Sequence, residues 1–514
     1  MAYIRKVPTK SGATAVQIAH TAYGKVIRIE HIGSAHNLEE LTLLESLARQ
    51  QLPESRQQSL LPANQPEPIR LIHSVSQLLY DTLSNLYDQL GFDTLSDEDF
   101  RRLCIARLVE PTSKLDSIRV LADLGINGGS EDRLYRCLKR VIANNYRDKL
   151  AKLCFAQASQ GAGITLVLYD VTTLYFEVQK EDDYRIPGMS KERRLEPQII
   201  IGLLVDQNGF PLELQSFEGN KAETKTILPV VEAFKKRHGL VGITVVADAG
   251  MLSADNLESL DKAGYTYIVG SRMHKIPYDI SEYQKTKELS DNQIITSKTA
   301  VAGQRVIYQY RAKRAALDLR NIDKQIEKAK KIVSGKTTAK KAKFLSVATK
   351  KKQLNQALID KAKALVGIKG YVTNLPTTEA SNARVIAYYH QLWHVEQSFR
   401  MSKSDLKARP IFHHHKEAIE AHLTVVMAAL AMGRVIERKT NLSIKKFVKT
   451  LRPIRSGTVV IDGKKYPAEA AIPTEVAPLL TVLKSNTLKW GSQVNFASVS
   501  MLHKTDRPNI KYCR

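Results

Sequence analysis

Five short apolar segments between residues 164 and 269 constrain the fold more than any other feature of the sequence. They are rich in β-branched and large apolar residues, which is typical of strands buried in a sheet. Two stretches with apolar residues at helical spacing, 222–238 and 254–263, separate the last three segments. The predicted strands are 164–171, 199–205, 211–218, 243–247 and 265–269. The order strand, strand, strand, helix, strand, helix, strand predicts an α/β domain around a mixed five-stranded sheet with flanking helices.

Two aspartates lie on these apolar strands. Asp170 interrupts the first strand, and Asp248 directly follows the fourth. An ionised carboxylate among apolar residues is costly unless it is paired or binds a cation. The strand order is that of a ribonuclease H-like domain, in which the first and fourth strands are neighbours, so we expect the two carboxylates to lie together. The alternatives are an ion pair of Asp170 with Arg193 or Arg194, and a turn or cap role for Asp248.

A third carboxylate, Glu396, lies in a helix predicted over 379–404. Residues that recur there every three or four positions would share one helix face: Tyr389, Trp393, Glu396, Arg400 and Lys403. The alternative is an amphipathic helix in which Glu396 pairs with Arg400 at i+4. Three oxygen donors without His or Cys favour Mg²⁺ or Mn²⁺ over Zn²⁺. Two such ions on one phosphate would activate the attacking oxygen and stabilise the leaving oxygen.

With these motifs the sequence resembles the DDE transposases of bacterial insertion sequences, in the branch with a Tyr-x2-Arg-x3-Glu-x6-Lys signature. The matching segments run in order over about residues 164–435: YDVTTLYFE, KERRLEPQIIIGLLVDQNGFPLELQSFEGNKAETKT, VVADAGMLS and YYHQLWHVEQSFRMSKSDLKARPI. The resemblance implies that Asp170, Asp248 and Glu396 form a catalytic, metal-binding triad. Tyr389 and Lys403 also match the signature. Leu392 stands at the position of its Arg, so Arg400 or a neighbour takes over that DNA contact or end recognition differs.

The resemblance implies an enzyme that binds double-stranded DNA at terminal inverted repeats, cleaves it there and joins the 3′-hydroxyl to target DNA. It also implies two Mg²⁺ or Mn²⁺ ions per active site, and we expect a homodimer in the complex with DNA. Trp393 would stack on a base swung out near the cut, and Lys403 would grip a phosphate beside it; the alternative for Trp393 is a core position. A nuclease that cuts without joining, or a catalytically inactive DNA-binding protein, are the alternative functions.

The charge of the chain agrees with a nucleic-acid partner. Its 514 residues hold 77 Lys and Arg against 52 Asp and Glu, a net charge of +25. Such an excess attracts polyanions, with nucleic acid first and an anionic membrane surface second. The four cysteines form no CxxC pair, so neither a disulfide framework nor a zinc site of the usual spacing is expected. No apolar stretch is long enough to predict a membrane span. We therefore expect a cytoplasmic, nucleoid-associated bacterial protein.

The N-terminal part of the chain is predicted to bind DNA. Residues 1–60 form a small α/β segment, and 72–150 form a helical region with a helix-turn-helix-like unit at 114–143. One face of its second helix carries four basic residues that would contact bases or phosphates: Arg133, Arg136, Lys139 and Arg140. The alternative is a solvated helix face.

The remaining segments flank or interrupt the catalytic core, which is predicted over 160–270 and 370–440. Between its two parts lies an insertion, 271–369, and within it a basic helical hairpin at 311–366 with seventeen Lys and Arg against four Asp and Glu. Its Lys350, Lys351 and Lys352 would contact phosphates, unless the lysines only solubilise the segment. Residues 441–514 are predicted to form a C-terminal α/β region.

Overall fold

The computed structural model describes most of the chain between residues 2 and 485. The described residues are 2–9, 12–52, 69–160, 163–177, 180–188, 195–240, 242–251, 253–271, 278–286, 288–298, 303–336, 342–348 and 351–485. The chain divides into two compact units. One comprises Met1–Ile69 with Ile461–Gly463, and the other comprises Arg70–Val460 with Lys464–Arg514.

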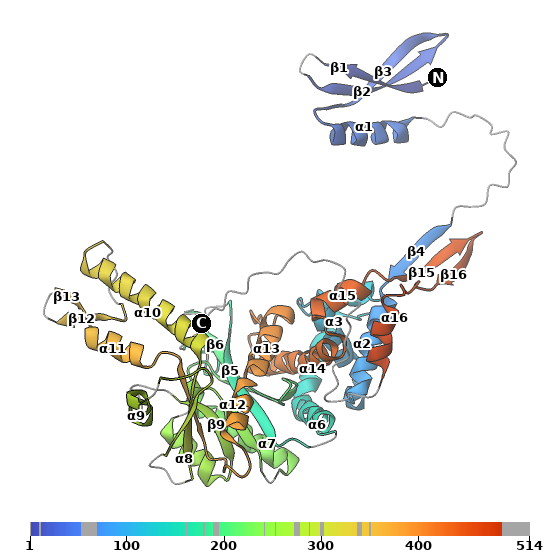
Figure 1. The fold of residues 1–514 in the computed structure, drawn as a ribbon. Coiled ribbons are helices and arrows are strands. Elements are labelled where there is room, and N and C mark those ends of the chain that lie inside the picture. The colour runs from blue at the N-terminus through green and yellow to red at the C-terminus, as the bar shows by residue number, and fades with distance from the viewer. Residues whose placement is uncertain are drawn as a thin grey trace. The chain divides into compact units, whose positions relative to one another are not determined.

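The N-terminal unit is a three-stranded antiparallel sheet with one helix packed on it (Figure 1). Its elements are β1 (Ala2–Pro8), β2 (Thr14–Ala22), β3 (Lys25–Ala35) and α1 (Leu38–Gln51). The Asn37 side chain begins α1 by accepting a hydrogen bond of 2.8 Å from the Glu40 amide. Val16 and Ile18 on the sheet and Ala48 on the helix form the small core.

The second unit is built around an eight-stranded mixed sheet in the order β10-β11-β14-β9-β8-β5-β6-β7. Its strands are β5 (Leu166–Tyr175), β6 (Gln198–Val205), β7 (Pro211–Glu218), β8 (Thr244–Ala247), β9 (Thr266–Ser271), β10 (Ile294–Lys298), β11 (Arg305–Tyr310) and β14 (Ile368–Thr373). The five predicted strands all occur, but the predicted five-stranded sheet is wrong, because three more strands extend it. β14 pairs antiparallel with β9, which would otherwise be an open edge with unpaired backbone groups.

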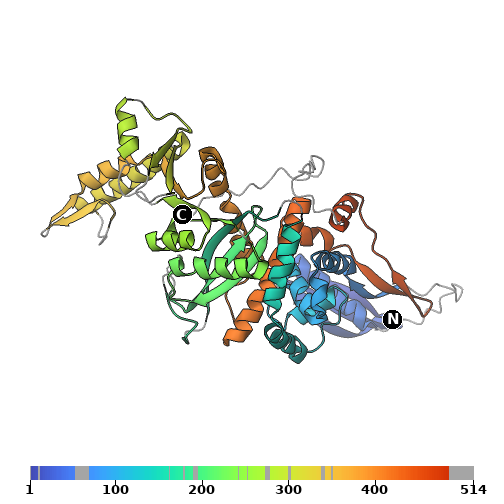
Figure 2. The same ribbon diagram turned by 90° about the horizontal axis from the view of Figure 1, so that it is seen from below.

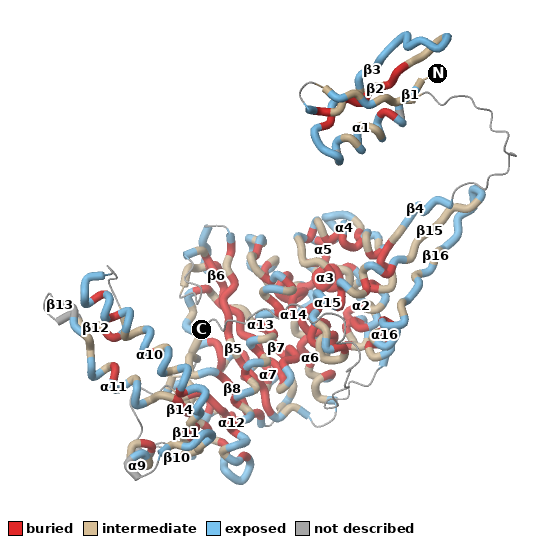
Figure 3. The backbone as a smooth tube through the Cα atoms, turned by 45° about the horizontal axis from the view of Figure 1, so that its top comes forward, coloured by how far each residue is buried: buried red, intermediate tan, exposed pale blue. Residues whose placement is uncertain are grey.

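Several helices pack on this sheet, and four of them cover the strands around its centre. α7 contacts β6 and β7, α8 contacts β9, α12 contacts β8 and β9, and α13 contacts β5 and β6. Their bounds are α7 (Ile227–His238), α8 (Ala254–Lys262), α12 (Asn382–His390) and α13 (Trp393–Arg400). Figure 3 shows that the central strands are buried along most of their length, as expected for strands covered on both faces.

A long buried helix, α14 (Lys416–Thr440), joins this sheet to a helical region (Figure 2). Within the described residues it is the one helix long and apolar enough to cross a membrane, but 94% of its most apolar window is buried inside the protein. Its Glu420 accepts hydrogen bonds from Arg147, Tyr184 and Ser216. The half-buried carboxylate is thereby satisfied by partners from three separate segments of the chain.

The helical region and the C-terminal residues form one structure. The helices are α2 (Gln77–Gln89), α3 (Glu98–Val109), α4 (Ser117–Asp123), α5 (Glu131–Ala143), α6 (Tyr146–Ala158), α15 (Ile444–Leu451) and α16 (Ala477–Lys484). A small antiparallel sheet connects the two chain segments through β4 (Arg70–Val75), β15 (Ser456–Ile461) and β16 (Lys464–Ala468). β4 precedes α2 and pairs with β15, and α16 contacts α2 and α14, so the described residues 456–485 pack on the helical region.

The basic segment 311–366 differs from the predicted helical hairpin. Two helices are present, but a β-hairpin lies between them. The elements are α10 (Ala312–Val333), β12 (Leu345–Ala348), β13 (Lys351–Leu354) and α11 (Gln356–Ala364), and α9 (Tyr278–Thr286) lies earlier in the insertion. Phe344, at the start of the β-hairpin, is fully buried against the helices. The hairpin therefore closes a small core that two helices alone would leave open.

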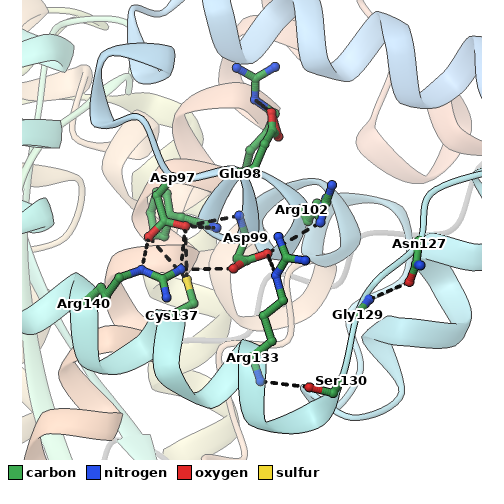
Figure 4. Close-up of polar contacts among 12 residues, drawn as sticks. Asp97, Glu98, Asp99, Arg102, Asn127, Gly129, Ser130, Arg133, Cys137 and Arg140 are labelled. Atoms are coloured by element: carbon green, nitrogen blue, oxygen red, sulfur yellow. Dashed lines mark hydrogen bonds and ion pairs between the residues drawn. The ribbon is translucent and has the colours of Figure 1, made fainter.

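Two aspartates at the start of α3 hold α5 in place (Figure 4). Asp97 caps α3 and accepts two hydrogen bonds from the Arg140 guanidinium, at 2.8 and 2.9 Å. Asp99 forms ion pairs with Arg140 at 3.1 Å and with Arg133 at 2.7 Å. Burial favours the neutral form of Asp97, but its hydrogen bonds, above all those from Arg140, lower its pKa below the usual range. Arg133 and Arg140, predicted to contact DNA, thus have a structural role.

We expect Asp97→Asn to lower the free energy of unfolding at pH 7 by about 2 kcal/mol, because the cap oxygen remains while the charged hydrogen bonds are removed. Since the folded pKa of Asp97 lies below its unfolded value, this stabilisation is present above about pH 4 and disappears as the pH falls through the folded pKa. Urea unfolding across this range measures both effects. The control Glu98→Gln removes an exposed pair with Arg101 and should change stability by less than about 1 kcal/mol.

Candidate active site

The parallel pairing of β5 with β8 brings two predicted carboxylates side by side. The register pairs Tyr169 with Ala247, so the next residues, Asp170 and Asp248, occupy neighbouring positions. β8 ends at Ala247, whereas β5 continues to Tyr175. β5 is paired with β8 only as far as Tyr169, and its Asp170 lines a pocket beyond the end of β8. The predicted neighbourhood of the two strands is confirmed.

Glu396 reaches the same pocket from α13. This helix packs against β5 and β6 through its apolar side, which includes the fully buried Val395. A pocket of about 410 Å³ is lined by all three carboxylates, from β5, from the end of β8 and from α13: Asp170, Asp248 and Glu396. In the described part of the chain no ion pair joins Glu396 to Arg400, so the alternative of an i+4 pair is not what the structure shows. Arg193 and Arg194, the alternative partners of Asp170, lie outside the described residues.

Tyr389, on α12, fixes the orientation of Asp248. Its hydroxyl donates a hydrogen bond of 2.7 Å to Oδ1 of Asp248. Burial and the nearby Asp248 charge raise the pKa of Tyr389, so the phenol keeps its proton and remains a donor. Gly270 on β9 allows this approach, because a Cβ there would lie 2.6 Å from the Tyr389 hydroxyl. The tyrosine of the sequence signature thus acts on the second aspartate in this fold.

Lys369, which was not predicted from the sequence as a site residue, also lines the pocket. It comes from β14, and its Nζ lies 4.4 Å from the centre of the Tyr389 ring. Burial lowers its pKa, while the charges of Asp248 and Glu396 act in the opposite direction. Its only signal in the sequence is a single Lys in the strand 368–373, which does not place it beside the carboxylates. Only the pairing of β14 with β9 does so.

The predicted continuous helix over 379–404 is broken, so its residues do not all share one face. α12 ends at His390, α13 begins at Trp393, and a π-helical turn, Met401–Asp405, contains Lys403. Leu392, which stands where the signature has Arg, is buried. Trp393 is 54% exposed and lines the pocket, which rules out the core position considered for it. Arg400 is exposed, and neither Arg400 nor Lys403 is among the pocket-lining residues.

The donor set of the pocket suits a hard divalent cation. The three carboxylates offer only oxygen atoms, the ligands that Mg²⁺ and Mn²⁺ prefer. Within the described ranges, no cluster of three or more His, Cys, Asp or Glu side chains has the geometry of a metal site. The three carboxylates fit such an ion by the chemistry of their donor atoms and by lining one pocket.

The other predicted DNA contacts lie elsewhere. On α5, Arg136 and Lys139 are exposed, and no ion pair of either residue occurs among the described residues. Lys351 and Lys352 lie on strand β13 instead of a helix, and Lys350 lies outside the described residues. The described cysteines, Cys104, Cys137 and Cys154, are buried free thiols.

Comparisons with known proteins place this site in a family. The solved structures that match this chain include a piggyBac transposase synaptic complex with hairpin DNA (TM-score 0.39, 11% identity, 74% of this chain and 79% of that one) and a Mos1 transposase paired-end complex with the left transposon end (TM-score 0.15, 10% identity, 33% and 58%). No curated protein matches the sequence. Residues 161–432, more than half of the chain and including all three carboxylates, match the transposase DDE domain. The chain belongs to the family of proteins with this transposase DDE domain.

Proposed function

We propose that this protein is the transposase of a bacterial insertion sequence, which cleaves DNA at the ends of its element and joins the freed 3′-hydroxyl to target DNA. The observation that carries the proposal is one pocket lined by Asp170, Asp248 and Glu396 inside the transposase DDE domain. The positive net charge of +25 supports DNA as the partner. In this proposal the enzyme acts as a homodimer on DNA and works on chromosomal DNA in the cytoplasm.

The residues of the pocket have distinct roles in this chemistry. Asp170, Asp248 and Glu396 would hold two Mg²⁺ or Mn²⁺ ions, which when bound would activate the attacking oxygen and stabilise the leaving one. Tyr389 holds the Asp248 carboxylate in a single orientation through its hydrogen bond. Lys369 supplies a fixed positive charge on the wall of the pocket, where a phosphate needs one. The exposed Trp393 ring offers a flat surface for a base beside the cut.

We expect Ala at Asp170, Asp248 or Glu396 to lower the cleavage rate by several orders of magnitude, since each carboxylate would bind the ions. The substrate is linear DNA that carries the genomic sequence from both sides of the gene, and labelled products are followed with Mg²⁺ present. Affinity for the same DNA, measured in the absence of divalent ions, should be kept. The matched control is Glu417→Ala, an exposed carboxylate in the first turn of α14, outside the residues that line the pocket.

The alternatives give different outcomes in the same assay. A nuclease would cut the ends but would fail to join a labelled, precut end to a target plasmid. An inactive DNA-binding protein would bind and not cut. Wild-type cleavage that survives Glu396→Ala would show that Glu396 is not part of the catalytic set.

The exposed position of Trp393 gives a second prediction. We expect Trp393→Ala to leave the melting temperature unchanged, because the side chain is 54% exposed. It should slow the later cleavage step more than the first nick, since removal of one stacked base costs about 1–3 kcal/mol. The ratio of nicked to fully cut product over time measures this, with Trp393→Phe as the conservative control. A lower melting temperature with an unchanged product ratio would show that the ring only packs.

The α5 helix gives a third prediction, which concerns recognition of the element ends. Of the four basic residues on the predicted face of α5, Arg133 and Arg140 form ion pairs with aspartates at the start of α3. The other two, Arg136 and Lys139, are exposed. We expect Arg136→Ala with Lys139→Ala to reduce the preference for end DNA over random DNA in competition binding at moderate salt. Arg119→Ala, an exposed residue of α4 that pairs with Glu110 and Asp116, is the control. Equally weakened binding of both DNAs would limit α5 to phosphate contacts.

A further inference from the structure

We infer that a basic pocket beside the carboxylates is a second phosphate-binding subsite. This subsite would hold the sugar–phosphate backbone of a DNA strand near the phosphate that reacts. The inference rests on the proposed function. The pocket lies between the first turn of α10 and the strands β11 and β14. The match to the transposase DDE domain covers these residues, at 161–432, without assigning a role to any of them.

The basic pocket and the carboxylate pocket have common walls. Their volumes are about 390 and 410 Å³, and both are lined by Lys369 and His390. Lys369 stands on β14 between them, over the ring of Tyr389, whose hydroxyl contacts Asp248. A strand with one phosphate among the carboxylates can therefore continue past Lys369 into the basic pocket.

The charge of this pocket is unusual for the start of a helix. Arg311 is the N-cap residue of α10, and Lys313 and Arg314 lie in its first turn, which has no acidic residue. The positive end of the helix dipole disfavours cations there and favours anions. All three side chains line the pocket. An anion bound between them would turn this unfavourable arrangement into a favourable one.

The carboxylates near these cations do not line the pocket. Asp318 forms an ion pair of 3.4 Å with Arg314, and Asp291 accepts a hydrogen bond of 2.8 Å from the Ala312 amide. Both lie outside the pocket-lining residues, which include four Lys and Arg and no Asp or Glu. Besides burial, the charge of Arg314 lowers the pKa of Lys369. The cations therefore repel one another across the pocket, and a phosphate would relieve this repulsion.

A buried amide gives an independent sign of a ligand. Gln309, on β11, lines the pocket and is only 7% exposed. Its side-chain oxygen is buried, and it has no hydrogen-bond partner among the described residues. A buried polar atom without a hydrogen-bond partner destabilises the folded state. An amide oxygen only accepts, so its partner would be a base N–H group of the bound strand. With the amide turned by 180°, its NH₂ group would occupy this position and donate to a phosphate.

Two DNA strands could supply the phosphate: the strand of the element that is cut, or the target strand that is attacked. The chemistry of the subsite is the same for both. Cleavage of an uncut end without target DNA depends on the first strand alone, whereas joining of a precut end depends also on the second. The two reactions, run in parallel, therefore identify the source.

The test compares two double variants of the full chain from which the same number of charges is removed. Arg311→Gln with Lys313→Gln removes two cations from the pocket. Lys324→Gln with Lys328→Gln removes two exposed cations farther along the same helix, outside the pocket. Melting temperatures confirm that both fold. Affinity for a short random-sequence duplex is measured against salt concentration without divalent ions, and KM and kcat are measured for cleavage and for joining.

We expect the pocket variant to lower the salt slope by about 0.9 for each phosphate that it no longer neutralises, and the helix control to leave the slope nearly unchanged. The KM of the pocket variant should rise about tenfold while its kcat is largely kept, since binding of the ground state and of the transition state is weakened equally. A higher KM in both cleavage and joining assigns the subsite to the cut strand. A higher KM in joining alone assigns it to the target strand. Equal slopes and KM values for the two variants would overturn the inference. Wild-type protein that does not cleave would instead overturn the proposed function.

Discussion

The parallel pairing of β5 with β8 is the constraint on which the rest of the molecule depends. Because their register ends at Tyr169 and Ala247, Asp170 and Asp248 occupy adjacent positions, one within a strand and one at the end of its neighbour. A parallel pair needs a long crossover connection, here β6, β7 and α7, and both faces of such strands must be covered. α12 packs on β8 and α13 packs on β5, and this packing brings Tyr389 and Glu396 to the same pocket.

Three carboxylates around one pocket repel one another, and two neighbouring groups reduce this cost before any cation binds. Tyr389 donates a hydrogen bond to Asp248, and its raised pKa keeps that donor protonated. Lys369 is drawn towards its charged form by Asp248 and Glu396, although burial and Arg314 act against it. The pocket therefore combines acidic ligands with a positive wall, which is the arrangement that a metal-bound phosphate requires.

The strand order and the neighbouring aspartates could be predicted because they follow from apolar periodicity and chain topology. Pairings between distant segments could not. β14 joins β9 across an insertion of about a hundred residues, and only this pairing brings Lys369 to the carboxylates. Helical spacing likewise predicts one helix over 379–404, since no Gly or Pro marks the break between His390 and Trp393. The ion pairs of Arg133 and Arg140 with Asp97 and Asp99 could not be predicted either, because α3 and α5 are separate segments of the sequence.

The positive charge of the insertion divides into a local and a distant part. α10 has 22 residues, so it is about 33 Å long at 1.5 Å per residue. At physiological salt, charges are screened beyond about 8 Å, so lysines near its far end contribute little at a phosphate beside its first turn. Those lysines are also partly paired, as Lys330 is with Glu327. Arg311, Lys313 and Arg314 differ from them, because they line a pocket that shares Lys369 with the carboxylate pocket. In the proposed function these three would hold a DNA strand during the reaction, and the remaining charge of the helix would speed the approach of DNA at low salt.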